Sequence, residues 1–166
     1  LIHHAYDQNE ESWINEGLAE LAMSASGYED AGHLHAYLAD HSEPLVAADF
    51  AHYGAVMLWG TFLYERFGAD YVKALVKAPQ NGIAGLLAAW DASAIDETFE
   101  GAFGDWALWN ALGTYELLTL PAMNPDGAIP ALEDGYAAGE VSVPAYSYLW
   151  LAGPVVGATA HQDLII

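Results

Sequence analysis

Trp13-Ile14-Asn15-Glu16-Gly17-Leu18-Ala19-Glu20 is the stretch from which the fold of this chain can be worked out. Apolar residues recur at helical spacing from Ile14 onward, which predicts an α-helix over residues 13–26. Ser12 or Asn9 could cap its start, and Gly27 is a typical residue to end it. The stripe predicted to be buried consists of Ile14, Leu18, Leu21, Ala22 and Ala25.

The same reasoning predicts helices along much of the remaining chain. We expect a long apolar helix over residues 48–67, ended by Gly68, and a short one from Asp70 to Lys77. Two more are expected over residues 83–90 and 97–112. Residues 28–47 contain three histidines and several acids, and we expect them to be irregular.

The C-terminal part has a different composition. Residues 119–140 are rich in Pro, Gly and acids and are expected to form a long loop. Residues 141–151 alternate large aromatic residues with smaller ones, which favours a β-strand. The predicted fold class is therefore mainly α, with a helical unit over residues 1–140 and the start of a β region over residues 141–166.

Composition excludes several classes of protein. An apolar content of 54% and a mean hydropathy of +0.17 argue against disorder, and the absence of cysteine excludes disulfides and thiolate metal sites. Acidic residues number 23 against three basic ones, for a net charge of −20. This charge argues against nucleic acid and against anionic membranes as partners. A secreted or extracellular acidic protein is expected, or one that works in high salt.

The pattern W-x-N-E-G-x-A-E at Trp13–Glu20 resembles the helix that carries the third metal ligand in gluzincin zinc peptidases. A weaker resemblance to the bacterial hyicolysin-like group covers most of residues 1–150. It implies the helical C-terminal subdomain of a zincin-like catalytic domain, with zinc as cofactor and Glu16 as its third protein ligand. The implied reaction is hydrolysis of a peptide or protein substrate by metal-activated water.

The other two ligands of such a site come from an H-E-x-x-H helix, and this pattern does not occur in the chain. Leu1-Ile2-His3-His4 resembles the residues that directly follow the second His of that helix. We therefore expect a fragment that is inactive alone and whose partner is the preceding part of the same domain. His3 and His4 would lie at the end of that helix, where a cationic His suits the helix dipole.

Glu20 lies one turn beyond Glu16 on the same face and could hold a ligand His through its other ring nitrogen. Gly17 would let this helix approach the upstream one closely. The alternative is that the two acids form an ordinary solvated face opposite the apolar stripe. Trp13 and Gly17 lie on the side of the acids, which is unusual for a solvated face.

Gluzincins also use a Tyr or His to stabilise the oxyanion of the tetrahedral intermediate. His52 and Tyr53 are the candidates, at the start of the long apolar helix. Adjacent helical residues point about 100° apart, so we expect only one to face the metal, and we favour Tyr53. The alternative is that both residues only pack against neighbours.

Two further metal sites are less favoured. His33, His35 and His41 have suitable ligand types for a second metal, but no predicted element fixes them. The carboxylates around residues 124–127 and 133–135 lack the spacing of a calcium-binding loop. A peptidase-like domain without catalysis, used for binding or adhesion, remains the alternative function. Substrate preference and exo- or endopeptidase action are not indicated by the sequence.

Overall fold

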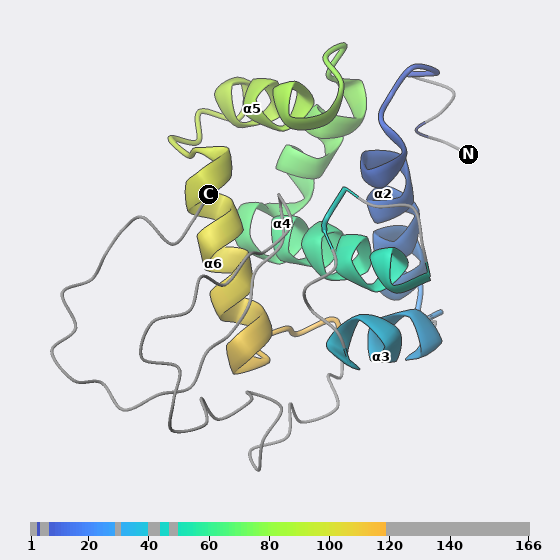
Figure 1. Cartoon of the computed structure of the whole chain (residues 1–166). Helices are drawn as coiled ribbons and strands as arrows, with labels where there is room; N and C mark the ends of the chain where they lie inside the picture. Colours follow the sequence, from blue (N-terminus) through green and yellow to red (C-terminus); the bar gives the residue numbers. More distant parts are fainter. Residues whose placement is uncertain (1–2, 4–6, 29–30, 40–43, 47–49, 119–166) are drawn as a thin grey trace, which may run out of the picture.

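The computed structural model describes residues 3, 7–28, 31–39, 44–46 and 50–118 (Figure 1). These ranges hold five helices and no strand, so the predicted mainly α class is confirmed for them: α2 (Ser12–Ala25), α3 (Ala31–Ala39), α4 (Phe50–Lys77), α5 (Gly82–Ala92) and α6 (Phe99–Leu112). The expected loop over 119–140, the expected strand over 141–151 and the boundary after residue 140 lie outside the described residues.

Helix α4 is the element against which the other four pack (Figure 1). Its middle part is buried on every side, because consecutive residues from Ala55 to Leu63 are all buried. Such a helix is expected at the centre of a helical domain, whereas surface helices alternate apolar and polar faces. Helices α2 and α3 lie against its first half and α5 against its C-terminal half, with α6 also in contact.

Helix α4 consists of two helical segments joined at Gly68. This residue has φ 85° and ψ 172°, a conformation that favours glycine because other residues carry a Cβ. The prediction of a helix end at Gly68, followed by a second helix to Lys77, is confirmed.

Two glycines let neighbouring helices approach α4 closely. A Cβ on Gly60 would lie 2.6 Å from the carbonyl oxygen of Gly17 in α2. A Cβ on Gly54 would collide with the carbonyl oxygen of His33 and lie 2.6 Å from Cβ of Tyr37, both in α3. Among the described elements, Gly17 packs closely against α4, whereas the approach predicted for it was toward a helix upstream of α2.

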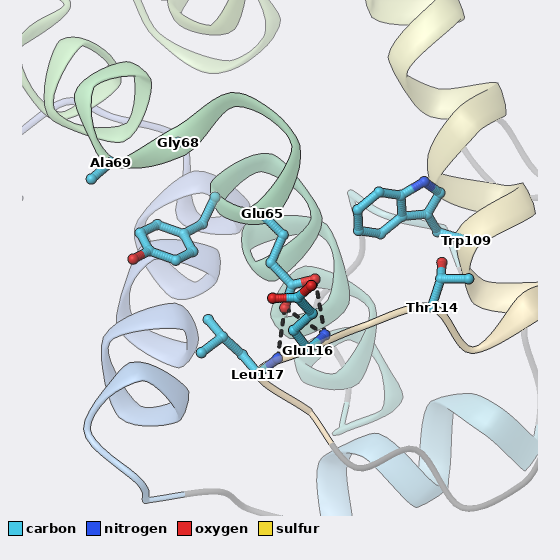
Figure 2. A pocket seen from close by; sticks show the side chains of 8 residues that line it. Glu65, Gly68, Ala69, Trp109, Thr114, Glu116 and Leu117 are labelled. Carbon is cyan, nitrogen blue, oxygen red and sulfur yellow. Dashed lines mark hydrogen bonds between the residues drawn. The ribbon is translucent and has the colours of Figure 1, made fainter.

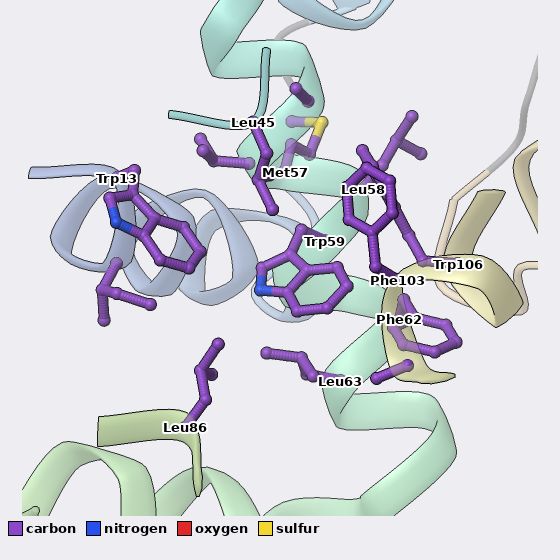
Figure 3. Close-up of a cluster of buried hydrophobic side chains, with 14 of the residues drawn as sticks. Trp13, Leu45, Met57, Leu58, Trp59, Phe62, Leu63, Leu86, Phe103 and Trp106 are labelled. Atoms are coloured by element: carbon purple, nitrogen blue, oxygen red, sulfur yellow. The ribbon is translucent and has the colours of Figure 1, made fainter. Parts of the chain in front are cut away.

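The hydrophobic core is built around aromatic rings from α4 and α6 (Figure 3). Trp59 is 1% exposed, and its ring centroid lies between 5.5 and 6.4 Å from those of Phe62, Phe99, Phe103 and Trp106. Tyr37 of α3 stacks on Trp106, with centroids 6.2 Å apart. The rings thus join three helices into one core.

The prediction that residues 28–47 are irregular is wrong for α3. Leu34 and Tyr37 are buried at helical spacing, and Leu38 packs beside them. The apolar face of α3 has only three large residues, and the histidines and acids around them make it hard to recognise in the sequence. The described residues also include buried Leu45, which joins the same core.

The predicted buried stripe of α2 is wrong at its C-terminal half, where Ala22 and Ala25 are exposed. The buried residues are instead Trp13, Ile14, Gly17, Glu20, Leu21 and Ser24. Neither predicted cap is found, because Glu11 occupies the N-cap position and makes no side-chain cap hydrogen bond. The helix is held by packing on α4 rather than by its ends.

The segment before α2 is tied to the start of α5. Oε1 of the buried Glu10 accepts a hydrogen bond of 2.7 Å from the backbone N–H of Gly82. A carboxylate at a helix N-terminus is favourable because the helix dipole is positive there. This contact fixes where the chain enters α2. None of the described helices meets the length and hydropathy that crossing a membrane requires.

Candidate functional site

The two acids of the W-x-N-E-G-x-A-E stretch have different environments. Glu20 is only 5% exposed, while Glu16 is partly exposed. At 100° per residue, Glu20 falls within the buried face of α2 and Glu16 at its edge. The solvated-face alternative is therefore wrong for Glu20. Glu16 is partly exposed to solvent and lies one helical turn from the buried carboxylate of Glu20.

Glu20 faces a histidine of α3. Its Oε1 lies 3.5 Å from Nδ1 of His33, whose side chain is 18% exposed. Burying a carboxylate is costly unless a partner compensates for the lost water, and a protonated imidazole at this distance would pair with it. The sequence did not predict this contact, because α3 itself was not predicted.

Tyr53 of α4 completes the cluster. Its ring stacks on that of His33, with centroids 5.0 Å apart and an interplanar angle of 28°. Glu20, His33 and Tyr53 come from α2, α3 and α4 respectively, so the three helices converge at this point. We call these three residues the polar cluster.

The structure separates the two candidates for the oxyanion donor. His52 is 2% exposed, whereas Tyr53 is partly exposed. Their rings meet edge to face, 6.0 Å apart. A group that binds substrate must be reachable, and of this pair the Tyr53 side chain is the more accessible. The burial of His52 agrees with a packing role.

His3 lies beside α2. It has helical conformation, and its carbonyl accepts a helical hydrogen bond from the N–H of Asp7. Its buried ring places Nδ1 2.9 Å from Oδ1 of Asn15, which is the residue before Glu16. Because Asn15 Oδ1 only accepts, His3 Nδ1 carries the proton. His4 lies outside the described residues.

The described residues do not contain three or more metal-ligating side chains grouped closely enough to hold an ion. His35 is exposed on α3, and His41 and both candidate calcium segments lie outside the described residues. Glu16 alone therefore cannot form the tetrahedral zinc site expected of a gluzincin.

A pocket of about 430 Å³ lies elsewhere, where α4 approaches the segment after α6 (Figure 2). The carboxylate of Glu65 in this pocket accepts backbone hydrogen bonds from Glu116, at 3.0 Å, and Leu117, at 2.7 Å. This arrangement holds the chain after α6 against α4. Tyr53 and Glu65 are twelve residues apart along α4, or about 18 Å, so the pocket is separate from the polar cluster.

Comparison with known proteins identifies no relative. No protein-family model matches the chain, and no curated protein or solved structure shows significant similarity to it.

Proposed function

We propose that this chain is part of a zinc-dependent peptidase, in which Glu16 is one of three protein ligands of the metal. The motif resemblance at Trp13–Glu20 suggests the function. The observation that carries it is the position of Glu20, a carboxylate that is 5% exposed and one turn from a partly exposed Glu16. Burying an acid on a helix already packed by Trp13 and Gly17 adds nothing to the apolar core and costs free energy, which supports a role for Glu20 in a site.

The position of His3 supports the same arrangement. His3 and Asn15 are each six residues from Asn9, so the chain reverses around Asn9. Two helices joined by a short connection lie antiparallel. A helix that continues N-terminally from His3 would therefore run along α2 toward Glu16 and Glu20. An H-E-x-x-H sequence ending just before Leu1 would place its histidines beside those two acids.

Glu16 is a suitable type of zinc ligand, but a zinc site needs three protein ligands and this chain supplies one. A carboxylate such as that of Glu16 is an ordinary zinc ligand, and Glu20 would accept a hydrogen bond from the second ring nitrogen of a ligand His. The two His ligands and the general base would be supplied by residues outside this chain. When bound, zinc supplies a Lewis acid that activates water and polarises the peptide carbonyl.

Tyr53 would act on the substrate directly. Its neutral hydroxyl can donate a hydrogen bond to the oxygen of the peptide carbonyl as negative charge develops there. Such a donor stabilises the transition state more than the bound substrate. The ring of Tyr53 stacks on His33, and the Tyr53 side chain as a whole is partly exposed.

The test uses the natural protein with at least the residues of one further helix before Leu1. We expect one zinc per chain by elemental analysis and hydrolysis of an unfolded protein substrate that a chelator abolishes and added zinc restores. Zinc-free, inactive protein that carries an intact H-E-x-x-H would contradict the proposal. A degenerate upstream motif would instead indicate the non-catalytic binding or adhesion domain.

The variant Glu20→Gln tests the supporting carboxylate in the same protein. We expect zinc affinity or activity to fall by roughly 10–100-fold, as is typical when a residue that orients a ligand is lost. Glu100→Gln is the matched control, because Glu100 is exposed on α6. Equal behaviour of the two variants would mean that Glu20 has no part in the site.

A further inference from the structure

His33 lies between two residues of the proposed site. Its Nδ1 is 3.5 Å from Oε1 of Glu20, and its ring stacks on Tyr53 at 5.0 Å. Glu20 and Tyr53 are on different helices, and His33 contacts both from a third. The sequence motif that suggested a metal site includes neither His33 nor its helix.

The backbone of His33 is held firmly in place. Gly54, next to Tyr53, has no room for a Cβ because it packs against the carbonyl oxygen of His33 and Cβ of Tyr37. Tyr37 is fully buried and stacks on Trp106, so α3 is anchored in the aromatic core. Because α3 is anchored in this way, the ring of His33 is held at a fixed position over the ring of Tyr53.

We infer that His33 is a positioning residue, which fixes the ring of Tyr53 relative to Glu20. This inference rests on the proposed function. A partly exposed Tyr that is free to rotate would place its hydroxyl over a range of positions, whereas a stacked ring is restricted. Misplacing a catalytic group by about 1 Å can lower a rate by about 100-fold. His33 acts through Tyr53 and need not touch the substrate.

Two substitutions separate the two contacts of His33. His33→Phe keeps a flat ring for stacking on Tyr53 but removes the nitrogen that faces Glu20. His33→Asn removes the ring while keeping a polar side chain. His35→Asn is the matched control, since His35 is exposed on the same helix.

The geometry can be tested on the 166-residue chain by nuclear magnetic resonance of its histidine rings, without any metal. We expect Tyr53→Leu to move the ring proton signals of His33, because the ring current of Tyr53 is lost. Glu20→Gln should move the ring nitrogen signals of His33. The signals of His35 should stay in place in both variants. His33 signals that respond to neither change would overturn the inference.

The role is tested by kinetics in the longer, zinc-containing protein. His33→Asn should lower kcat by about 10–100-fold with little change in KM, and His33→Phe should restore most of the loss. In the Tyr53→Phe background, His33→Asn should cost little more, because His33 acts through the missing hydroxyl. Full additivity of the two changes would overturn the inference. If the unsubstituted protein contains no zinc, the proposed function is contradicted instead. The resonance experiment would still show whether His33 contacts Tyr53 and Glu20.

Discussion

The aromatic core around Trp59 and the polar cluster around Tyr53 share helix α4 but differ in kind. They are six residues apart, or about 9 Å along the helix. Around Trp59 the neighbours are the rings of Phe62, Phe99, Phe103 and Trp106. Around Tyr53 they include a histidine, which in turn faces a buried carboxylate.

This difference separates stability from the proposed function. Burial of an aromatic ring contributes a large favourable free energy and demands only that neighbours fit. Burial of a carboxylate requires a partner, and apolar replacements at such sites are often neutral or stabilising. The polar cluster therefore lies on a framework that the aromatic core holds together, and changes in the two regions should have different consequences.

Trp59→Ala should have the largest effect on folding. Removing a fully buried large ring typically lowers the free energy of unfolding by about 3–5 kcal/mol, because a cavity remains. Urea unfolding followed by circular dichroism measures it. Leu108→Ala is the control, because Leu108 is 47% exposed, and it should change stability by less than about 0.5 kcal/mol. If Trp59→Ala lowers the free energy of unfolding by less than about 1 kcal/mol, Trp59 is not at the centre of the core.

Tyr53→Phe should do the opposite, leaving folding intact and damaging catalysis in the longer protein. Loss of one oxyanion donor lowers kcat by about 10²–10³-fold with little change in KM. His52→Ala should affect kcat less but destabilise the fold more, because His52 is buried. If His52→Ala abolishes turnover while Tyr53→Phe retains it, the imidazole is the donor.

Gly60→Ala tests how closely the framework brings α2 to α4. The new Cβ would meet the backbone of Gly17 at 2.6 Å, so the two helices must separate. We expect a loss of about 1–3 kcal/mol despite the higher helix propensity of alanine. Gly17→Ala should cost less, because its nearest contact is 3.2 Å. Equal effects of the two substitutions would show that the interface adapts freely.

The smallest effect is expected far from both regions, at the exposed pair of Asp70 and Lys73. Their side chains are 2.8 Å apart. The hydrogen bond and charge of Lys73 lower the pKa of Asp70, and those of Asp70 raise the pKa of Lys73. The contribution of this pair to folding stability is lost as the pH falls through the lowered pKa of Asp70. It is also lost as the pH rises through the raised pKa of Lys73.

Lys73→Gln should therefore change thermal stability slightly at neutral pH and not at all once Asp70 is protonated. Melting temperatures of the two proteins, compared at neutral and strongly acidic pH, measure this. A difference that persists unchanged in acid would mean that Lys73 acts through some other contact.

The sequence predicted the elements that have strong local signals. Apolar residues at helical spacing predicted α2, α4, α5 and α6. Gly68 indicated the break in α4, where a positive φ favours glycine. Helix α3 was missed because only three of its apolar residues are large and because it packs against Gly54 of another helix. Its stability depends on tertiary contacts that local spacing does not show.

The candidate site was predictable only in part for the same reason. Glu16, Glu20, His52 and Tyr53 could be identified from a motif and from the resemblance that it carries. The link between Glu20 and Tyr53 passes through His33, in the segment whose helix was missed. A sign was present in the sequence, since Trp13 and Gly17 share the face of Glu20 and indicate that this face is packed.

The proposed role of Glu16 as a zinc ligand is measured by the metal content of Glu16→Gln in the longer protein. Glu100→Gln serves as the control, because it removes one negative charge from an exposed position. We expect about one zinc per chain in the control and, after dialysis against zinc-free buffer, essentially none in Glu16→Gln. Zinc retained by Glu16→Gln at the affinity of the unsubstituted protein would contradict it.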